Sequence, residues 1–269
     1  MSEERVIRQT PELPATVDSL SADLTDLGVR KGDVLLVHAS LSSLGWVCGG
    51  AVSVIQAMQK AVGDNGTIVM PSFTSNLSEP SLWSNPPVPE SWWPIVRSEL
   101  PPFDPLTTPS CGVGAIAECF RTIPSVCRSN HPHVSFAASG PVAHQIVASH
   151  QIEDGLGDSS PLGKLYDMGA RIVLLGVEFD RCTALHLAEI RSETRSDIAT
   201  GAPVIIDGQR KWVTFSEPEF HDARFCEIGE AFASQESCMQ SRGVACATAM
   251  LIPLRELVDF AETIFRTKG

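Results

Sequence analysis

The amino-acid sequence predicts a single compact α/β domain, residues 1–269, with a central mixed sheet flanked by helices. Short apolar runs typical of buried strands alternate with amphipathic segments typical of helices. A length of 269 residues fits one large domain with ample core. The sequence has no internal repeat, low-complexity stretch or obvious linker, so we expect one continuous unit.

The N-terminal part of the chain alternates helix and strand. Amphipathic periodicity predicts helices over residues 14–28 and 49–63, each closed by a glycine. The apolar runs DVLLVHAS (33–40) and TIVMPSF (67–73) predict buried strands. The next segment, about residues 74–109, is rich in Pro, Ser and Trp and has little periodicity. A loop this long inside a compact domain is usually functional, so we expect a lid or a wall of a binding site.

The C-terminal part continues the alternation and adds a hairpin. Helices are predicted over 113–123, 140–149, 183–190, 219–234 and 254–265, and extended segments over 133–140 and 171–177. Within residues 202–215, Asp207 and Gly208 stand between two β-rich runs. An Asp-Gly pair in this setting is a strong signal for a two-residue hairpin turn.

Composition and charge narrow the classes of function. Hydrophobic residues make up 43% of the chain and charged residues 19%, an ordinary globular balance. The formal net charge of −12 argues against nucleic acid and anionic membrane surfaces as partners, and it suits a cationic ligand. No apolar run approaches the roughly 18 to 20 residues of a membrane span, and the polar N-terminus lacks the apolar core of a secretion signal.

Cysteines, histidines and glycines form none of the familiar cofactor motifs. The eight cysteines show no CxxC pair and no compact framework, which predicts reduced core thiols in a cytoplasmic protein. The histidines do not have zinc-ligand spacings, so we expect no metal site. CGVGAIA (111–117) mimics a dinucleotide fingerprint but does not follow an apolar strand. Neither a P-loop nor a GxSxG elbow is present.

The candidate catalytic residues lie in the helix that follows the strand at 171–177. Thr183, His186 and Glu189 are three residues apart, which places their side chains on one helix face. Their neighbours are apolar, so we expect the helix to be mostly buried. A His beside a carboxylate can serve as a general base, because the carboxylate fixes the tautomer and stabilises the imidazolium. The alternative is a structural His in the core whose ring nitrogens have hydrogen-bond partners but no catalytic role. His38, at a strand end, is a lesser candidate for which we favour a structural or cofactor-side role.

Three polar clusters lie near the ends of predicted elements. Residues 40–50 place Ser hydroxyls and glycines at a helix start, which suits either an anion cradle or an ordinary polar turn. Residues 128–132 combine Arg, Ser and His beside a rigid Pro, which suits either a phosphate site or an ordinary surface loop. Glu217, Glu219 and Asp222 either grip an ammonium group or form the acidic first turn of a helix.

Six motifs give the chain a resemblance to a known family over nearly its whole length. They are VLLVHASLSSLG, GTIVMPSF, TTPSCGVGAIAE, RSNHPHVSFAASG, SPLGKL and LLGVEFDRCTALHLAE. The chain resembles the aminoglycoside N(3)-acetyltransferases, acetyl-CoA-dependent antibiotic-modifying enzymes unrelated to the GNAT fold. The stretches NPPVPESWW and SLGWVCGGAVSVIQA look like the Bacillus-type branch of that family.

The resemblance implies a role for individual residues. His186 matches the family's catalytic His, the general base of a direct acetyl transfer, and Glu189 the acid beside it. Residues matched to coenzyme A contacts are Ser40, Leu41, Ser42 and Ser43 (pyrophosphate and pantetheine), Ser110, Gly112 and Val113 (pantetheine arm), and Arg128 and His131 (nucleotide end). Glu217 and Glu219 match acids that engage amino groups of the acceptor. The implied reaction acetylates the 3-amino group of the 2-deoxystreptamine ring of an aminoglycoside, with acetyl-CoA as co-substrate and no metal.

Two other classes of function are also consistent with the sequence. One is a coenzyme A-binding relative that acts on a different amine or serves as a binding module. The other is a Ser/His/Glu hydrolase with its nucleophile among the hydroxyls of residues 40–43. The chain also departs from the family at Met250, where members often carry an Arg, and this puts the contact of that Arg in question. Nothing in the sequence indicates an oligomeric state.

Overall fold

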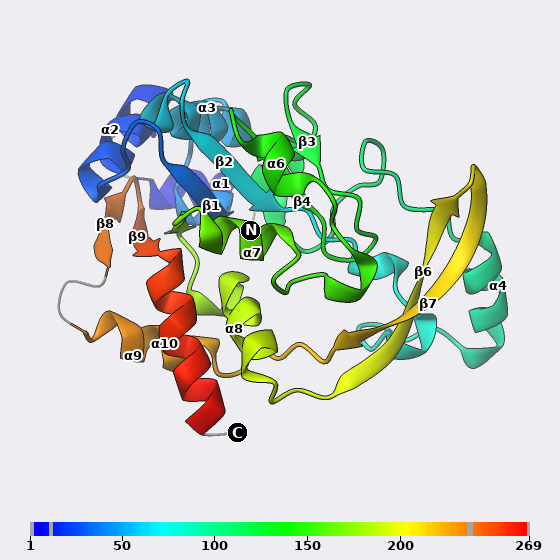
Figure 1. Ribbon diagram of the computed structural model, residues 1–269. Coiled ribbons are helices and arrows are strands. Elements are labelled where there is room, and N and C mark those ends of the chain that lie inside the picture. The colour runs from blue at the N-terminus through cyan, green and yellow to red at the C-terminus, as the bar shows by residue number, and fades with distance from the viewer. Residues whose placement is uncertain (1–2, 11–12, 236–238, 268–269) are drawn as a thin grey trace.

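A seven-stranded mixed sheet runs through the centre of the protein (Figure 1). The computed structural model describes residues 3–10, 13–235 and 239–267. The strand order is β3-β4-β2-β1-β5-β9-β8. The strands are β1 (Val34–Ala39), β2 (Thr67–Pro71), β3 (Cys127–Arg128), β4 (Phe136–Ser139), β5 (Arg171–Leu175), β8 (Gln240–Val244) and β9 (Ala247–Pro253). The middle strands β2, β1 and β5 are parallel, and the flanking pairs are antiparallel. The predicted α/β domain with a mixed sheet is therefore confirmed.

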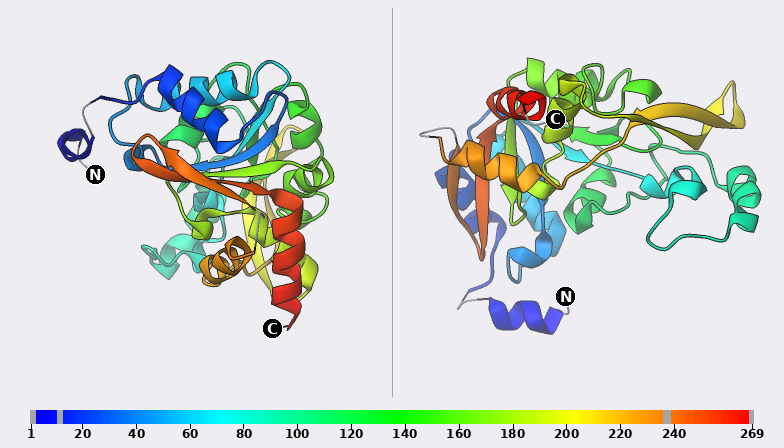
Figure 2. Two further views of the ribbon diagram at one scale, coloured as in Figure 1. Left: turned by 90° about the vertical axis from the view of Figure 1, so that its left-hand side faces the viewer. Right: turned by 90° about the horizontal axis from the view of Figure 1, so that it is seen from below.

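Helices cover both faces of this sheet and create two hydrophobic cores (Figures 1 and 2). One face carries α2 (Val17–Leu27), α3 (Gly50–Val62) and α5 (Gly114–Arg121); the other carries α6 (Ala143–Val147), α7 (Pro161–Asp167), α8 (Ala184–Ser192), α9 (Phe225–Ala233) and α10 (Leu254–Thr267). Successive side chains of a strand point to opposite faces. In β1, Leu35 and Val37 accordingly join the core with α2 and α3, while Leu36 joins the core with α8 and α10.

The ends of α2 illustrate why the predicted helices form where they do. Thr16 caps its first turn, because its hydroxyl accepts a hydrogen bond from the backbone N–H of Ser19. Gly28 ends it in the left-handed region at φ 110°, where a residue without a Cβ is favoured. None of the helices in the described ranges is long and apolar enough to cross a membrane.

A two-stranded hairpin stands apart from the main sheet (Figure 1). It consists of β6 (Asp197–Ile206) and β7 (Gln209–Pro218). Asp207 and Gly208 form the predicted turn, both with positive φ, 55° and 74°. The hairpin lies beside α4 (Trp93–Glu99), and Arg210 ties the two together by donating to the carbonyls of Leu100 (2.8 Å) and Arg97 (2.6 Å).

The segment at about 74–109 is more ordered than expected. It holds α4 and three single 3₁₀ turns, η2 (Ser75–Leu77), η3 (Pro80–Leu82) and η4 (Glu90–Trp92). These elements are too short to produce a visible hydrophobic period, and they are held by long-range contacts such as those of Arg210. The segment forms one wall of the smaller cavity described below through Ser75, Ser78 and Leu82.

Several expectations about elements and cysteines are corrected by the structure. The helix expected over 219–234 begins only at Phe225, because the chain first continues the hairpin, with Glu219 N–H donating to Ser196 O (3.0 Å). Helices α1 (Glu3–Gln9) and α7 and the β8–β9 hairpin were not predicted. Of the seven described cysteines, all free thiols, only Cys182 is buried; Cys48, Cys111 and Cys246 are exposed, since they lie in turns and loops. Cys238 lies outside the described residues.

Candidate active site

The site is built where parallel strands end. β1 ends at His38 and Ala39, and β5 leads through Gly176 (φ 67°) and the 3₁₀ turn η6 (Phe179–Arg181) into α8. In α/β sheets, the carboxyl ends of parallel strands are the usual position of ligand sites, because loops and helix starts converge there. His38 of the first strand and His186 of α8 consequently line the same cavity.

His186 and Glu189 form a buried pair on α8. Nδ1 of His186 lies 2.7 Å from Oε2 of Glu189, whose side chain is 1% exposed. A carboxylate oxygen only accepts hydrogen bonds, so Nδ1 carries a hydrogen and donates a hydrogen bond to Glu189. Nε2 then has the free lone pair, and the ring, 14% exposed, faces the cavity. The rings of Phe220 and Phe225 flank the imidazole in T-shaped arrangements, with centroid distances of 4.9 and 4.7 Å.

Arg195 is a third member of this arrangement that the sequence did not indicate. Its Nε (3.0 Å) and Nη2 (2.6 Å) both donate to Oε1 of Glu189. The two carboxylate oxygens of Glu189 thus serve different partners, His186 and Arg195. Arg195 lies six positions beyond Glu189 and past the end of α8, so helical spacing gives no signal for it.

The cavity in front of His186 has a volume of about 1040 Å³. Among the expected coenzyme A contacts, it is lined by Ser40, Leu41, Ser42, Gly112 and Val113. Residues that the sequence did not indicate also line it, among them Glu3 and Val6 of α1, Trp46, Asp180 and Arg181. These residues come from distant parts of the chain, so no local sequence pattern indicates that they line one cavity.

Three helices begin at this cavity without a side-chain cap. Gly49, Val113 and Thr183 occupy the N-cap positions of α3, α5 and α8, and none of these residues makes a side-chain capping hydrogen bond. The first N–H groups of a helix have no partner within the helix, and the helix dipole favours negative charge there. The N–H groups of Leu185 and His186 already donate to the carbonyls of Cys182 and Thr183, so the starts of α3 and α5 are the ones that offer backbone donors to an anionic group.

His38 is the second histidine of the cavity and a weak base. It is buried, and its Nε2 lies 3.3 Å from the hydroxyl oxygen of Thr183. Burial, reinforced by nearby His186, lowers the pKa of His38 to about 3. The ring is therefore neutral at physiological pH and binds a proton poorly, which leaves His186 as the histidine suited to proton transfer.

The serine turn contains no nucleophile–base pair. The hydroxyl of Ser43 donates to Ser40 Oγ (2.9 Å), which lies 3.3 Å from Ser42 Oγ, and Ser43 does not line the cavity. Within the described part of the chain, none of these hydroxyls hydrogen-bonds to His38 or His186. A Ser/His/Glu hydrolase needs such a contact, so the geometry gives that alternative no support.

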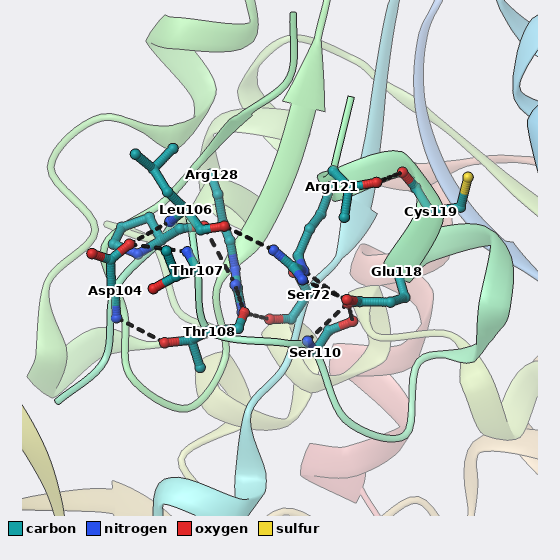
Figure 3. A network of polar contacts seen from close by, with 12 residues as sticks. Ser72, Asp104, Leu106, Thr107, Thr108, Ser110, Glu118, Cys119, Arg121 and Arg128 are labelled. Atoms are coloured by element: carbon teal, nitrogen blue, oxygen red, sulfur yellow. Dashed lines mark hydrogen bonds and ion pairs between the residues drawn. The ribbon is translucent and has the colours of Figure 1, made fainter. Parts of the chain in front are cut away.

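Ser110 does not line the cavity. It anchors the loop that precedes α5 by its contacts with Glu118 (Figure 3). Its N–H donates to Oε2 of Glu118 (2.9 Å), and its hydroxyl donates to the same oxygen. Burial alone would raise the pKa of Glu118, but the hydrogen bonds from Arg121 and Ser110 lower it to about 2. The carboxylate thus fixes the start of the stretch that carries Gly112 and Val113 into the cavity.

The structure does not bring Arg128 and His131 to the cavity. The Arg128 guanidinium donates to Ser135 Oγ (2.9 Å) and to the carbonyls of Ser72 (2.6 Å) and Thr108 (2.5 Å), as Figure 3 shows in part. Burial lowers its pKa to about 10. His131 is fully buried, and its Nδ1 accepts from the backbone N–H groups of His133 and Val134 (3.1 Å each). Both side chains make hydrogen bonds within the protein, and neither is placed at the cavity as the expected phosphate loop requires.

The three acids predicted to lie close together, Glu217 at the end of β7 and Glu219 and Asp222 after it, are divided between two cavities and the surface. Asp222 lines the large cavity. Glu217 lines a smaller cavity of about 400 Å³, which shares Phe73, Gly112 and Val113 with the large one, and its Oε2 lies 3.2 Å from His133 Nδ1. Glu219 is half exposed and lines neither. All three precede α9, so they do not form its first turn.

Met250 is part of the core. It lies in β9 opposite Leu174 of β5, is 9% exposed, and packs in the core beneath α8 and α10. At this position of the sheet, the chain therefore places an apolar side chain and makes no charged contact.

A family model described as aminoglycoside 3-N-acetyltransferase matches residues 36–266. A 47% identical relative is the SPbeta prophage-derived aminoglycoside N(3')-acetyltransferase-like protein YokD of Bacillus subtilis, with 96% of this chain and 95% of the relative covered. The aminoglycoside N(3)-acetyltransferase VII of Streptomyces paromomycinus is 32% identical over 96% of this chain and 94% of its own length. The expected Bacillus-type branch is thereby confirmed.

Solved structures give the same result. The crystal structure of YokD from Bacillus subtilis superposes with a TM-score of 0.96 at 46% identity, covering 98% of both chains. The structure of AAC-IIIb with CoASH has a TM-score of 0.85 at 27% identity, with 95% of this chain and 98% of that chain covered. AAC-VIa bound to sisomicin has a TM-score of 0.85 at 28% identity, with 96% and 99% covered.

Proposed function

Because the chain belongs to the aminoglycoside 3-N-acetyltransferase family and is an acyltransferase, we propose that it transfers the acetyl group of acetyl-CoA to an aminoglycoside. The acceptor in this proposal is the 3-amino group of the 2-deoxystreptamine ring. The observation that carries the proposal is the position of His186, with Nδ1 bound to buried Glu189 and the ring on a large cavity. Such a pair suits the removal of a proton from an attacking amine.

Coenzyme A binding is supported by the donors around the cavity. The uncapped starts of α3 and α5 offer backbone N–H groups to an anion, and Ser40 and Ser42 add hydroxyls. The related AAC-IIIb was solved with CoASH. We assign the pyrophosphate and pantetheine to Ser40, Leu41, Ser42, Gly112 and Val113. Arg128, His131, Ser43 and Ser110 act as structural supports in this assignment.

The acceptor side is acidic, as a polycationic sugar requires. Asp222 lines the cavity with His186, and Glu217 lines the adjoining cavity. The overall charge of −12 favours the approach of a cation. The related AAC-VIa was solved with sisomicin bound. We therefore assign the amino groups of the acceptor to Glu217 and Asp222, and not to half-exposed Glu219.

In the proposed reaction, the two substrates are bound together and no acyl-enzyme forms. The neutral amine attacks the thioester carbonyl carbon, and Nε2 of His186 takes a proton from the amine nitrogen. The tetrahedral oxyanion is stabilised by backbone N–H groups at the start of α5, near Gly112 and Val113. The C–S bond then breaks, and the imidazolium returns its proton to the thiolate, which leaves as coenzyme A thiol.

A direct test incubates the protein with acetyl-CoA and a panel of aminoglycosides while free thiol is measured. The proposal expects thiol release that depends on the aminoglycoside, with one acetyl group found on the 3-amino nitrogen by NMR of the product. A panel that contains 3-amino acceptors and yields no acceptor-dependent thiol would contradict it. Acetylation of a different nitrogen would refute the regiochemistry only.

A further inference from the structure

We propose that Arg195 is a positioning residue for the transfer reaction, which holds the carboxyl group of Glu189 turned toward His186. This inference rests on the proposed role of His186 as the general base. Arg195 touches neither the cavity nor any reacting atom and acts only through Glu189.

The burial of Glu189 creates the need for Arg195. Its side chain is 1% exposed, and an isolated carboxylate in such a place would be strongly disfavoured in its charged form. Its Oε1 accepts two hydrogen bonds from the Arg195 guanidinium, at 3.0 and 2.6 Å. A planar fork on one oxygen fixes the rotation of the carboxyl group. That rotation directs the second oxygen, Oε2, to Nδ1 of His186 at 2.7 Å.

The base of the hairpin holds Arg195 and a wall of the His186 ring at the same time. Arg195 lies just before β6, and Phe220 lies just after β7. The two chain segments are joined by the hydrogen bond from Glu219 N–H to Ser196 O (3.0 Å). Phe220 packs edge-on against the His186 ring, with centroids 4.9 Å apart. The segment that enters the hairpin therefore holds the Glu189 carboxylate through Arg195, and the segment that leaves the hairpin packs against the His186 imidazole through Phe220.

Arg191, in the last turn of α8 and four positions before Arg195, provides a control. Its Nε (2.8 Å) and Nη2 (2.6 Å) also donate to a single carboxylate oxygen, Oδ1 of Asp158. That pair does not involve Glu189 or His186. Arg195→Gln and Arg191→Gln thus each remove a guanidinium that donates twice to one carboxylate oxygen, one beside the His–Glu pair and one away from it. Arg191 differs in that Asp158 is exposed and that its guanidinium also lies 3.9 Å from the Tyr166 ring centroid.

The first readout is the proton on Nδ1 of His186, which a strong hydrogen bond to a carboxylate shifts far downfield in the NMR spectrum. We expect this signal in the unsubstituted protein, in Arg195→Lys and in Arg191→Gln, and its loss in Arg195→Gln. The second readout is acetyl transfer: Arg195→Gln should lower kcat by about 10²-fold with KM values nearly unchanged, and Arg195→Lys should recover most of it.

The two readouts separate this inference from the proposed function. The NMR signal requires no acceptor, so its loss in Arg195→Gln alone would support the positioning role even if no aminoglycoside were acetylated. The inference is overturned if Arg195→Gln keeps the signal and the turnover, or if Arg191→Gln loses them to the same extent. Absence of the signal from the unsubstituted protein would contradict the His186–Glu189 hydrogen bond itself.

Discussion

At the scale of single residues, the proposed chemistry depends on the different partners of the two ring nitrogens of His186. Nδ1 is committed to Glu189, and Nε2 is left for the cavity. The other histidine of the cavity, His38, is a poor base, because burial lowers its pKa to about 3. Of the two histidines that line the large cavity, His186 is therefore the one with a carboxylate partner among the described residues.

The first prediction concerns the charge of Glu189. Glu189→Gln keeps the shape of the side chain but removes the charge that stabilises the imidazolium, so turnover should fall by about two orders of magnitude or more. Steady-state kinetics with acetyl-CoA and an aminoglycoside measure this. Glu193→Gln, an exposed residue just beyond the same helix, is the matched control and should keep the original turnover. Equal turnover in both variants would show that the carboxylate has no catalytic part.

Residue-level prediction from the sequence succeeds only where partners are local. His186 and Glu189 are three positions apart on one helix, so their contact follows from helix geometry. Arg195 reaches Glu189 from beyond the helix end, and Arg128 finds its partners 20 and 56 positions away in the chain. Such contacts are fixed by tertiary packing, which a single sequence does not reveal.

At the scale of elements, the start of α3 is the strongest candidate for binding the anionic cofactor. The helix has 13 residues and opens on the cavity at Gly49 and Gly50, with no side-chain cap. Gly50 has φ 58°, and a Cβ there would meet nothing within 4 Å. Asp and Asn both tolerate this backbone conformation better than other residues.

The second prediction places a charge at that helix start. Gly50→Asp should weaken coenzyme A binding by tenfold or more (about 1.4 kcal/mol), because a carboxylate occupies the place of the phosphates. Gly50→Asn has nearly the same size without the charge and should change the affinity much less. Isothermal titration with coenzyme A compares the two. If Asp and Asn weaken binding equally, the anion is not bound at this helix start.

Elements with a local sequence signal could be predicted, and elements that depend on contacts with distant parts of the chain could not. The turn at Asp207 and Gly208 was identified, because both positions require a positive φ that Asp and Gly tolerate. The β8–β9 turn places Ala245 at φ 51°, where no Gly or Asn announces a turn. The missed helix α4 is seven residues long and packs against a hairpin more than a hundred positions away.

At the scale of the whole molecule, the sheet brings the ends of β1 and β5 together and two cores hold them in place. The order of elements and the mixed α/β class follow from hydrophobic periodicity. The cavity does not, because α1, the starts of α3 and α5, and α8 meet only in the folded chain. Both views in Figure 2 show α1 set apart from the main body, although Glu3 and Val6 line the cavity.

The third prediction is a loss of stability in mild acid. Burial, with nearby His150 and His133, lowers the pKa of His131 to about 2, and burial lowers the pKa of His150 to about 4. Both rings stay neutral when folded but take up a proton near pH 6.5 when unfolded. Their contribution to the free energy of unfolding is therefore complete above about pH 6.5. It declines as the pH falls toward the folded-state pKa, about 4 for His150 and about 2 for His131. Protonation of each ring in the unfolded state should lower the free energy of unfolding by about 2 kcal/mol as the pH falls from about 6.5 to about 5.

Urea unfolding across that pH range measures the effect. His131→Asn keeps an acceptor for the two backbone N–H groups but cannot titrate, so the slope of stability against pH should decrease. His144→Asn, at an exposed position, should leave the slope as it is. An unfolding free energy that stays constant over this range would contradict buried neutral rings.

The most direct test of the account is a single-turnover measurement on His186→Ala with bound acetyl-CoA and an aminoglycoside acceptor. We predict that the rate of acetyl transfer falls by about 10² to 10⁴, while the affinity for coenzyme A and the rate of the exposed-site control His144→Ala stay near those of the unsubstituted protein. Acetyl transfer by His186→Ala at the unsubstituted rate would contradict the account.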